Sequence, residues 1–353
     1  MDNSGNAISR REASGGSGDP AARFLDGRLE AMGFHTLTDQ RCARASTGSA
    51  LGRCVLVLTD RCNFACPYCR KFGGGDLPYG EAARCIEGWA KDGLRALVLT
   101  GGEPTLHEGL PRLVSLASGL GISRICVATN GSADPRLYLD LVERGVDEFS
   151  ISLDSSEAGL GDLMAGGVPG AWRRVVDNIA LLSQRARVTV GAVLNPENLE
   201  AAQAIVAFAD SLGVADIRLN PAAQFSRRLP VLEWDRGLLE RHPTFAWRAA
   251  LTAAGGAVRG LEADDPRRCH IVLDEMTARD GAHYPCFVYM REGGLPIGRI
   301  GPSVRMERER WSLRHDPFED PICRGNCPDI CRAYNRRFEV LREGENARLR
   351  RSD

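Results

Sequence analysis

The sequence contains no hydrophobic run that approaches the ~20 residues needed to cross a bilayer. Its first twenty residues also lack the apolar region of a secretory signal. Acidic and basic residues nearly balance, 46 against 45, so no excess of positive charge predicts binding to nucleic acid or to an anionic membrane. Lysine is almost missing, since all basic residues except Lys71 and Lys91 are arginine. We therefore expect a cytoplasmic protein that binds neither nucleic acid nor a membrane.

Two common enzyme signatures are also missing. No Ser-His-Asp order suggests a hydrolase, and the glycine runs 73–75 and 166–167 do not form the G-x-G-x-x-G that opens a nucleotide-binding helix. Cysteine, by contrast, is abundant, with twelve in 353 residues. Clustered cysteines in a chain without an export signal more often bind metal or do redox chemistry than form disulfides.

A regular alternation of β-rich runs and amphipathic helical stretches fills the middle of the chain. We expect strands at Cys54–Thr59, Ala96–Thr100, Arg124–Thr129, Glu148–Leu153, Val188–Leu194 and Asp216–Leu219. We expect helices between them at Tyr79–Lys91, Leu110–Gly119, Pro135–Arg144, Ala171–Gln184 and Glu197–Leu212. This alternation predicts βαβ units and an α/β fold with a parallel sheet, either a partial barrel or an open doubly wound sheet.

Shifts in composition divide the chain into five segments. We expect a disordered leader and N-terminal extension (1–50, with a short helix at Arg23–Met32), the α/β unit (51–222), a helical connection (223–265), a small cysteine-rich unit (266–335) and a charged tail (336–353). The α/β unit and the cysteine-rich unit are the two expected domains.

The first cysteine cluster follows the first expected strand. Cys62, Cys66 and Cys69 have the spacing C-x3-C-x2-C, with Tyr68 before the last cysteine. A structural zinc site usually has four protein ligands, whereas a [4Fe–4S] cluster held by three thiolates keeps one iron open for another ligand. The spacing alone leaves a zinc knuckle or buried structural cysteines as alternatives.

This motif resembles the signature of the radical S-adenosylmethionine (SAM) superfamily. The resemblance implies a partial (β/α)6 TIM-type barrel with the cluster at its open carboxyl end. It also implies that SAM chelates the fourth iron, and that reduction of the cluster cleaves SAM to methionine and a 5′-deoxyadenosyl radical.

Later strand ends carry further segments that match the family. The run Gly101, Gly102, Glu103 and Pro104 resembles the GGEP motif, which holds the amino group of SAM. The resemblance places the segments Thr129-Asn-Gly and Ser152-Leu-Asp beside the ribose and methionine parts of SAM, and we expect contacts from Thr129, Asn130 and Ser152. We also expect a contact from Asn195, at the end of the fifth expected strand. Polar residues at such ends also cap helices, which is the alternative for several of them.

Asp154 follows the fourth expected strand and is a candidate catalytic residue. It lies in the segment Ser152-Leu-Asp154, which the resemblance places beside SAM. Its carboxylate can bind substrate or transfer a proton. Helix capping is the structural alternative here as well.

The second cysteine cluster resembles the SPASM and twitch extensions of radical SAM enzymes. Cys269 and Cys286 have the spacing of their opening hairpin, and Cys323, Cys327 and Cys331 follow. The later cysteine run of a full SPASM domain is missing, so we expect one auxiliary [4Fe–4S] cluster, held by Cys269, Cys286 and two of the three later cysteines. A structural zinc site is the alternative.

One thiol would be left over from this auxiliary cluster. It is a candidate hydrogen-atom donor to a substrate radical, and we take Cys331 as the catalytic candidate, with Cys126 as a less favoured one.

These features predict a radical SAM enzyme that abstracts a hydrogen atom from a peptide or a small natural-product substrate. The alternative is a dehydrogenase or epimerase of a sugar or aminocyclitol, and the remote one is a non-enzymatic iron–sulfur or zinc protein. We expect an electron donor such as flavodoxin or ferredoxin, and a separate peptide-recognition protein if the substrate is a peptide. A molybdenum-cofactor-type cyclase is not expected, because the chain ends Arg-Arg-Ser-Asp rather than Gly-Gly.

Overall fold

Six parallel strands form the framework of the molecule. The computed structural model describes residues 39–46, 48–70 and 73–352, so the expected leader (1–20) and the expected helix Arg23–Met32 lie outside the described residues. The parallel strands are β1 (Arg53–Thr59), β2 (Ala96–Gly101), β3 (Arg124–Thr129), β4 (Glu148–Ser152), β5 (Arg187–Leu194) and β6 (Asp216–Pro221). They match the expected strands to within two residues at each end.

The strands are buried on both faces, which explains their continuous apolar runs. Alternate residues such as Leu56, Leu97 and Leu99 pack with the helices in the main core. Their neighbours Val55 and Val98 point the other way, into a small cluster with Cys126.

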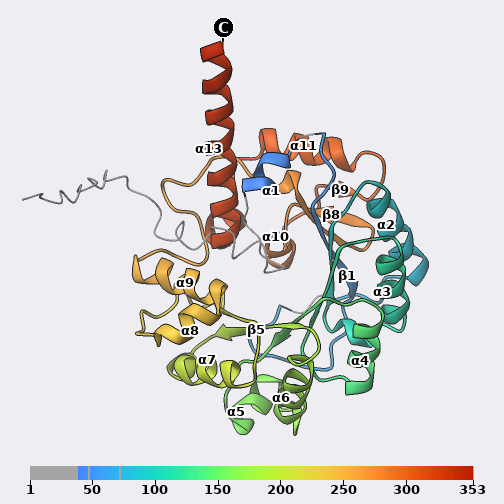
Figure 1. Cartoon of the computed structure of the whole chain (residues 1–353), viewed down its shortest axis with the longest axis vertical. Coiled ribbons are helices and arrows are strands. Elements are labelled where there is room, and N and C mark those ends of the chain that lie inside the picture. The colour runs from blue at the N-terminus through green and yellow to red at the C-terminus, as the bar shows by residue number, and fades with distance from the viewer. Residues whose placement is uncertain (1–38, 47, 71–72, 353) are drawn as a thin grey trace, which may run out of the picture.

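Helices cover the outer face of this sheet (Figure 1). They are α2 (Tyr79–Lys91), α3 (Leu110–Gly119), α4 (Pro135–Glu143), α5 (Ala158–Met164), α6 (Ala171–Leu182) and α7 (Ala202–Ser211), with short 3₁₀ turns at Pro104–Leu106 and Leu199–Ala201. The expected helix at 197–212 therefore begins later than predicted, because Asn195 and Asn198 form a side-chain-stabilised turn after β5. The short helix α5 was not expected, since it holds two glycines, which disfavour helix.

The cysteine-rich segment does not fold apart from this sheet. Its first strand, β7 (Glu275–Arg279), pairs in parallel with β1, so the sheet order is β6-β5-β4-β3-β2-β1-β7-β8-β9. Strands β8 (Ala282–Tyr284) and β9 (Gly298–Arg299) continue it in antiparallel fashion. Asp280 and Gly281 both have positive φ, as a tight hairpin turn between β7 and β8 requires. The six-stranded unit expected from sequence is thus extended by the segment that follows it.

Most of the remaining helices fill the arc between α7 and α2 in Figure 1. These remaining helices are α1 (Asp39–Arg44), α8 (Arg236–Arg241), α9 (Pro243–Ala253), α10 (Phe287–Arg291), α11 (Val304–Arg314), α12 (Pro321–Asn326) and α13 (Asp329–Ser352), with a 3₁₀ turn at Ile271–Leu273. The expected charged tail is the end of α13, which projects from the body in Figure 1. Among the described residues, no helix combines the length and the apolar character that a membrane span needs.

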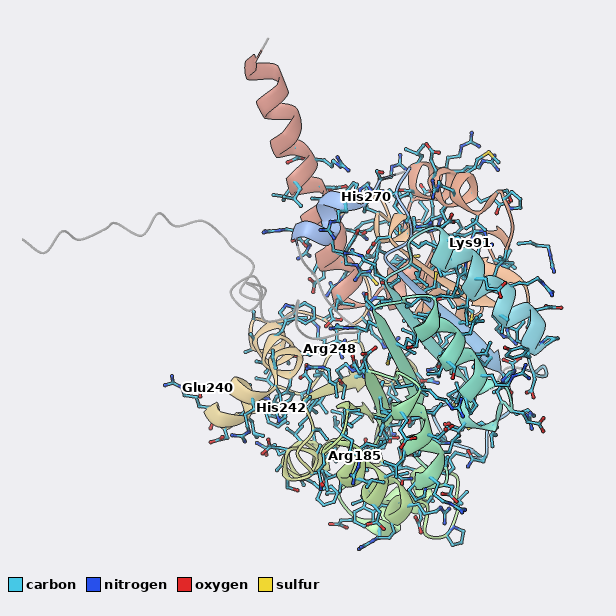
Figure 2. All side chains as sticks on the ribbon, turned by 45° about the vertical axis from the view of Figure 1, so that its right-hand side comes forward. Lys91, Arg185, Glu240, His242, Arg248 and His270 are labelled. Carbon is cyan, nitrogen blue, oxygen red and sulfur yellow. The ribbon has the colours of Figure 1, made fainter. Side chains whose placement is uncertain are left out.

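A buried ion pair ties the helical connection to the last helix. Arg248 on α9, labelled in Figure 2, donates to both carboxylate oxygens of Asp329 at 2.9 and 3.0 Å. It also donates to the carbonyl of Leu219 at 2.7 Å, which covers the outer edge of β6. Covering an edge in this way prevents pairing with another strand.

Candidate functional site

Three cysteines lie together on the loop that leaves the carboxyl end of β1. The backbone N–H of Cys69 donates to the carbonyl of Cys66 at 3.0 Å, which makes a tight turn between two of them. Ala65 in this loop donates its N–H to the carbonyl of Ala165 at 3.0 Å. Gly166, with φ of +89°, approaches Ala65 so closely that a Cβ at this glycine would lie 2.7 Å from the Ala65 Cβ. The loop is therefore held against the segment that follows α5.

The thiols of this loop interact with one another. Burial, Asp154 and the two neighbouring thiols raise the pKa of Cys66 to about 12, and burial raises the pKa of Cys62. These thiols therefore stay protonated unless a metal binds, since a metal stabilises thiolates. Three thiols on one loop fit a [4Fe–4S] cluster that keeps one iron open, because such clusters are held by cysteine thiolates.

The three cysteines open onto a cavity of about 460 Å³ at the carboxyl ends of the strands. This is the position at which barrels of parallel strands bind their ligands. Of the residues expected to contact SAM or substrate, the lining contains Gly101, Gly102, Thr129, Asn130, Ser152 and Asp154. Its volume lies in the range of cofactor and small-molecule sites.

Gly101 and Gly102 allow the end of β2 to approach the cysteine loop. A Cβ at Gly101 would lie 2.3 Å from the carbonyl oxygen of Thr59, and one at Gly102 would lie 2.3 Å from that of Arg61. Both contacts are with backbone, so any other residue would displace the loop.

Glu103 lies beneath the cavity and is fully buried. One carboxylate oxygen accepts hydrogen bonds from the N–H and hydroxyl of Thr105 and from the hydroxyl of Thr129, at 3.1, 2.7 and 2.7 Å. The other accepts from the N–H of Asn130 at 2.6 Å. Burial raises the pKa of Glu103, and these donors oppose the shift. The side chain thus ties the end of β2 to the end of β3.

Asp154 sits at the wall of the cavity, where its carboxylate is held on both sides. The Tyr68 hydroxyl donates to one oxygen at 2.5 Å, and the N–H of Val193 donates to the other at 2.7 Å. Burial raises the pKa of Asp154 to about 6, against the effect of both donors. A carboxyl group with this pKa changes its charge near neutral pH, which suits proton transfer.

Besides Glu103, two further residues expected near SAM do not line the cavity. Pro104 is buried at the start of the 3₁₀ turn after β2. The side-chain oxygen of Asn195 accepts a hydrogen bond from the N–H of Glu197 at 2.9 Å, and the N–H of Asn195 donates to the side-chain oxygen of Asn198. Asn195 therefore shapes a turn. This is the capping alternative for Asn195.

The five later cysteines gather at a second cavity. It is lined by Cys269, Cys286, Cys323, Cys327 and Cys331, together with apolar side chains such as Tyr289 and Trp311. Burial and the neighbouring thiol of Cys286 raise the pKa of Cys269 to about 12, and burial raises that of Cys286 to about 11. Cys331 is the most buried of the five and packs in an apolar cluster with Tyr334 and Phe338, against which Cys269 and Cys327 also pack. It lines the second cavity, whereas the candidate radical site is the first.

Helix α10 connects the two cysteine sites. It begins after Cys286, whose sulfur accepts the N–H of Tyr289 at 3.3 Å. Its other residues Phe287, Met290 and Arg291 line the first cavity. Arg291 places Nη2 3.9 Å from the sulfur of Cys69.

Sequence reasoning missed several lining residues. Arg70 and Arg291 bring positive charge to the cavity, Ser150 lies on its floor, and Trp172 and Phe287 form apolar walls. Arg70 and Phe287 directly follow cysteines that were singled out, which is the only signal they carry. The others come together through tertiary packing.

The chain was compared with known proteins. Residues 56–209 match the model of the Radical SAM superfamily. The GTP 3′,8-cyclase of Pelotomaculum thermopropionicum is 38% identical over 34% of this chain and 40% of its own length, and that of Geobacter sulfurreducens is 34% identical over 38% and 43%. The probable GTP 3′,8-cyclase of Methanopyrus kandleri is 28% identical over 76% of this chain and 93% of its own length. The chain therefore spans less than half of the first two relatives.

Solved structures resemble the fold at low sequence identity. SuiB of Streptococcus suis has a TM-score of 0.53 with 15% identity, over 78% of this chain and 67% of SuiB. The native anSMEcpe with bound AdoMet has a TM-score of 0.53 with 13% identity, over 85% and 98%. These likenesses support the expected α/β partial barrel.

The comparisons correct the expected reaction. Many of the curated relatives are named GTP 3′,8-cyclase, so the expectation of a peptide or natural-product substrate was wrong, and the sugar or aminocyclitol alternative does not fit either. The reasoning from the terminal Arg-Arg-Ser-Asp, which set aside a cyclase, gave too much weight to one end of the chain. The expected peptide-recognition protein rested on the peptide substrate and loses its basis.

The superfamily assignment, by contrast, is confirmed, and with it SAM and a [4Fe–4S] cluster as cofactors. The matched segment contains all three cysteines of the first cluster and the Gly101–Pro104 run. The curated relatives are enzymes by name, a GTP 3′,8-cyclase and an AdoMet-dependent heme synthase among them. Residues 56–209 of the chain thus form a domain of the radical SAM superfamily.

Proposed function

We propose that this enzyme cleaves SAM at the Cys62, Cys66 and Cys69 site and directs the resulting radical onto a purine nucleotide, with GTP as the first candidate. One observation carries the proposal: a single cavity of about 460 Å³ joins the three thiols, the polar ends of β2 to β4 and two arginines. The names of the curated relatives supply the nucleotide.

The cluster would be held by the three thiolates, and it supplies the electron that cleaves SAM when both are bound. The glycines at the end of β2 leave backbone groups accessible beside it. Thr129, Asn130 and Ser152 offer hydrogen-bonding side chains on the neighbouring strand ends. Apolar walls that include Trp172 and Phe287 exclude water, which protects a reactive radical.

Arginines at the cavity favour an anionic substrate. Arg70 pairs with Glu292 at 2.8 Å, and Arg291 lies one residue before that glutamate. Arg259, from the helical connection, does not line the cavity but interacts electrostatically with both Arg291 and Glu292. Burial lowers the pKa of Arg259, which shows the cost of holding this cation away from water. Triphosphate oxygens would offset that cost, because arginine matches phosphate geometry.

An auxiliary cluster at the second cavity is part of the proposal. We assign Cys269, Cys286, Cys323 and Cys327 as its ligands and leave out Cys331, which is the most buried of the five, although Cys323 and Cys331 both interact electrostatically with the other three cysteines. Four thiols fit a [4Fe–4S] cluster, and the expected twitch-like extension is retained in this form. Cys331 would then be the spare thiol, within a cytoplasmic enzyme that receives electrons from a donor such as flavodoxin or ferredoxin.

The test is an anaerobic assay of the reconstituted enzyme with SAM, dithionite and GTP. We expect GTP to increase the formation of 5′-deoxyadenosine and to be converted to a new nucleotide, with loss of both in the Cys66→Ala variant. Arg291→Gln should weaken the dependence on GTP and spare the slow cleavage of SAM without substrate. Arg236→Gln, on the exposed helix α8, is the matched control. SAM cleavage that GTP leaves unchanged would contradict the nucleotide proposal.

A further inference from the structure

A histidine contacts one of the proposed ligands of the auxiliary cluster. Nε2 of His315 lies 3.5 Å from the sulfur of Cys323, within hydrogen-bond range for sulfur. His315 follows the end of α11, whereas Cys323 lies on α12, so the contact joins two elements. Both side chains are largely shielded from solvent.

The surroundings of His315 determine the orientation of its ring and the ring nitrogen that carries the hydrogen. The ring stacks on Trp311 with centroids 4.0 Å apart and planes 20° apart. The second neighbour of Nε2 is Oδ2 of Asp320, at 3.8 Å. A thiolate and a carboxylate are both acceptors, so the neutral imidazole places its hydrogen on Nε2, facing them.

Asp320 is itself held in place. Its Oδ1 accepts the N–H groups of Ile322 and Cys323 at 2.8 and 3.1 Å, and its Oδ2 accepts the Tyr289 hydroxyl at 3.0 Å. Tyr289 also donates its N–H to the sulfur of Cys286. The aromatic cluster of Tyr289, Trp311 and His315 therefore supports two proposed ligands from one side.

We propose that His315 is a positioning residue that donates a hydrogen bond to the Cys323 thiolate and raises the reduction potential of the auxiliary cluster. The physical reason is charge: reduction adds an electron to the cluster, and an N–H dipole aimed at a ligand sulfur stabilises the more negative state. This inference rests on the auxiliary cluster of the proposed function.

The test separates the auxiliary cluster from the first one. In a full-length variant with Cys62, Cys66 and Cys69 replaced by alanine, any reconstituted cluster reports on the second site. An EPR-monitored redox titration then gives its midpoint potential. In this background, His315→Phe keeps a ring for stacking on Trp311 but removes the donor, and His315→Gln restores an N–H at similar reach.

We expect His315→Phe to retain its iron and to shift the midpoint potential to more negative values, with His315→Gln returning it toward the parent. His270→Phe is the matched control, because His270 stacks on Phe338 and its Nε2 faces Glu339 at 3.2 Å. An unchanged potential in His315→Phe would overturn the inference alone. Loss of iron in that variant would also overturn it, since His315 would then be a ligand. If the variant with Cys62, Cys66 and Cys69 replaced by alanine binds no iron, the proposal of an auxiliary cluster and the inference about His315 both fail. SAM cleavage by the intact enzyme is then judged by its own assay.

Discussion

Replacement of Glu103 by glutamine separates two roles for the GGEP segment. Resemblance to the family assigns this segment to the amino group of SAM, whereas the structure turns the carboxylate toward four donors of the protein itself. The N–H groups of Thr105 and Asn130 approach different carboxylate oxygens. A glutamine has only one oxygen, so its NH₂ group must face one of these two backbone donors.

A buried donor left without an acceptor costs roughly 1–3 kcal/mol. For a domain of this size, the melting temperature should fall by about 2–4 °C for each kcal/mol lost. The measurement is thermal unfolding of the apoprotein by circular dichroism, followed by anaerobic calorimetry of SAM binding to the reconstituted enzyme. Glu108→Gln is the control, since Glu108 lies in the same loop but is exposed.

The reasoning is refuted if Glu103→Gln melts at the same temperature as Glu108→Gln and loses SAM affinity only. That result would return Glu103 to the direct role that the resemblance implies.

Three further predictions test the packing around the two sites. Gly166→Ala should destabilise the apoprotein more than Gly167→Ala. Both substitutions impose a positive φ on alanine, which costs roughly 1–2 kcal/mol, but only a Cβ at Gly166 would also clash with Ala65. Equal melting temperatures of the two variants would contradict this. Asp329→Ala should lower the free energy of unfolding, measured by urea titration, by roughly 3–5 kcal/mol, because it leaves Arg248 buried without its carboxylate partner. Glu240→Ala removes an exposed ion pair with Arg236 and should have almost no effect. Burial raises the pKa of Asp154 to about 6, so the folded protein favours the neutral carboxyl group. The stabilisation from this neutral group is fully present below about pH 4 and is lost as the pH rises through 6. Asp154→Asn, which stays neutral, should therefore gain in stability relative to the parent apoprotein as the pH rises from about 4 to about 6. A parallel pH dependence of the two would count against a raised pKa.

The parallel strands and the cysteine loop were predictable from local patterns. Two-sided burial leaves continuous apolar runs, and the C-x3-C-x2-C spacing is contained in eight residues. The parallel pairing of β7 with β1 was not predictable, because it joins residues more than two hundred positions apart and the run Glu275–Arg279 is short and polar.

The substrate-facing part of the site was less accessible to sequence reasoning. Asp154 was identified, but its partner Tyr68 was noted only for its place in the motif, and the contact forms across the cavity. Glu103 and Asn195 show the reverse: their types and positions suggested ligand contacts, yet local hydrogen bonds turn them toward the protein. Side-chain direction at a strand end depends on neighbouring loops, and a single sequence does not encode those neighbours in any local pattern.

The pairing of β7 with β1 limits how this enzyme can be recombined with its relatives. A chimera joined after residue 222 would exchange the proposed auxiliary ligands, but it would also exchange the strand that completes the hydrogen bonding of β1. β1 leads directly into the cysteine loop, so a foreign seventh strand in the wrong register would disturb the first cluster while leaving its ligands unchanged. Exchange of substrate range by grafting should therefore use junctions after Tyr284, where β7 and β8 stay with their own barrel.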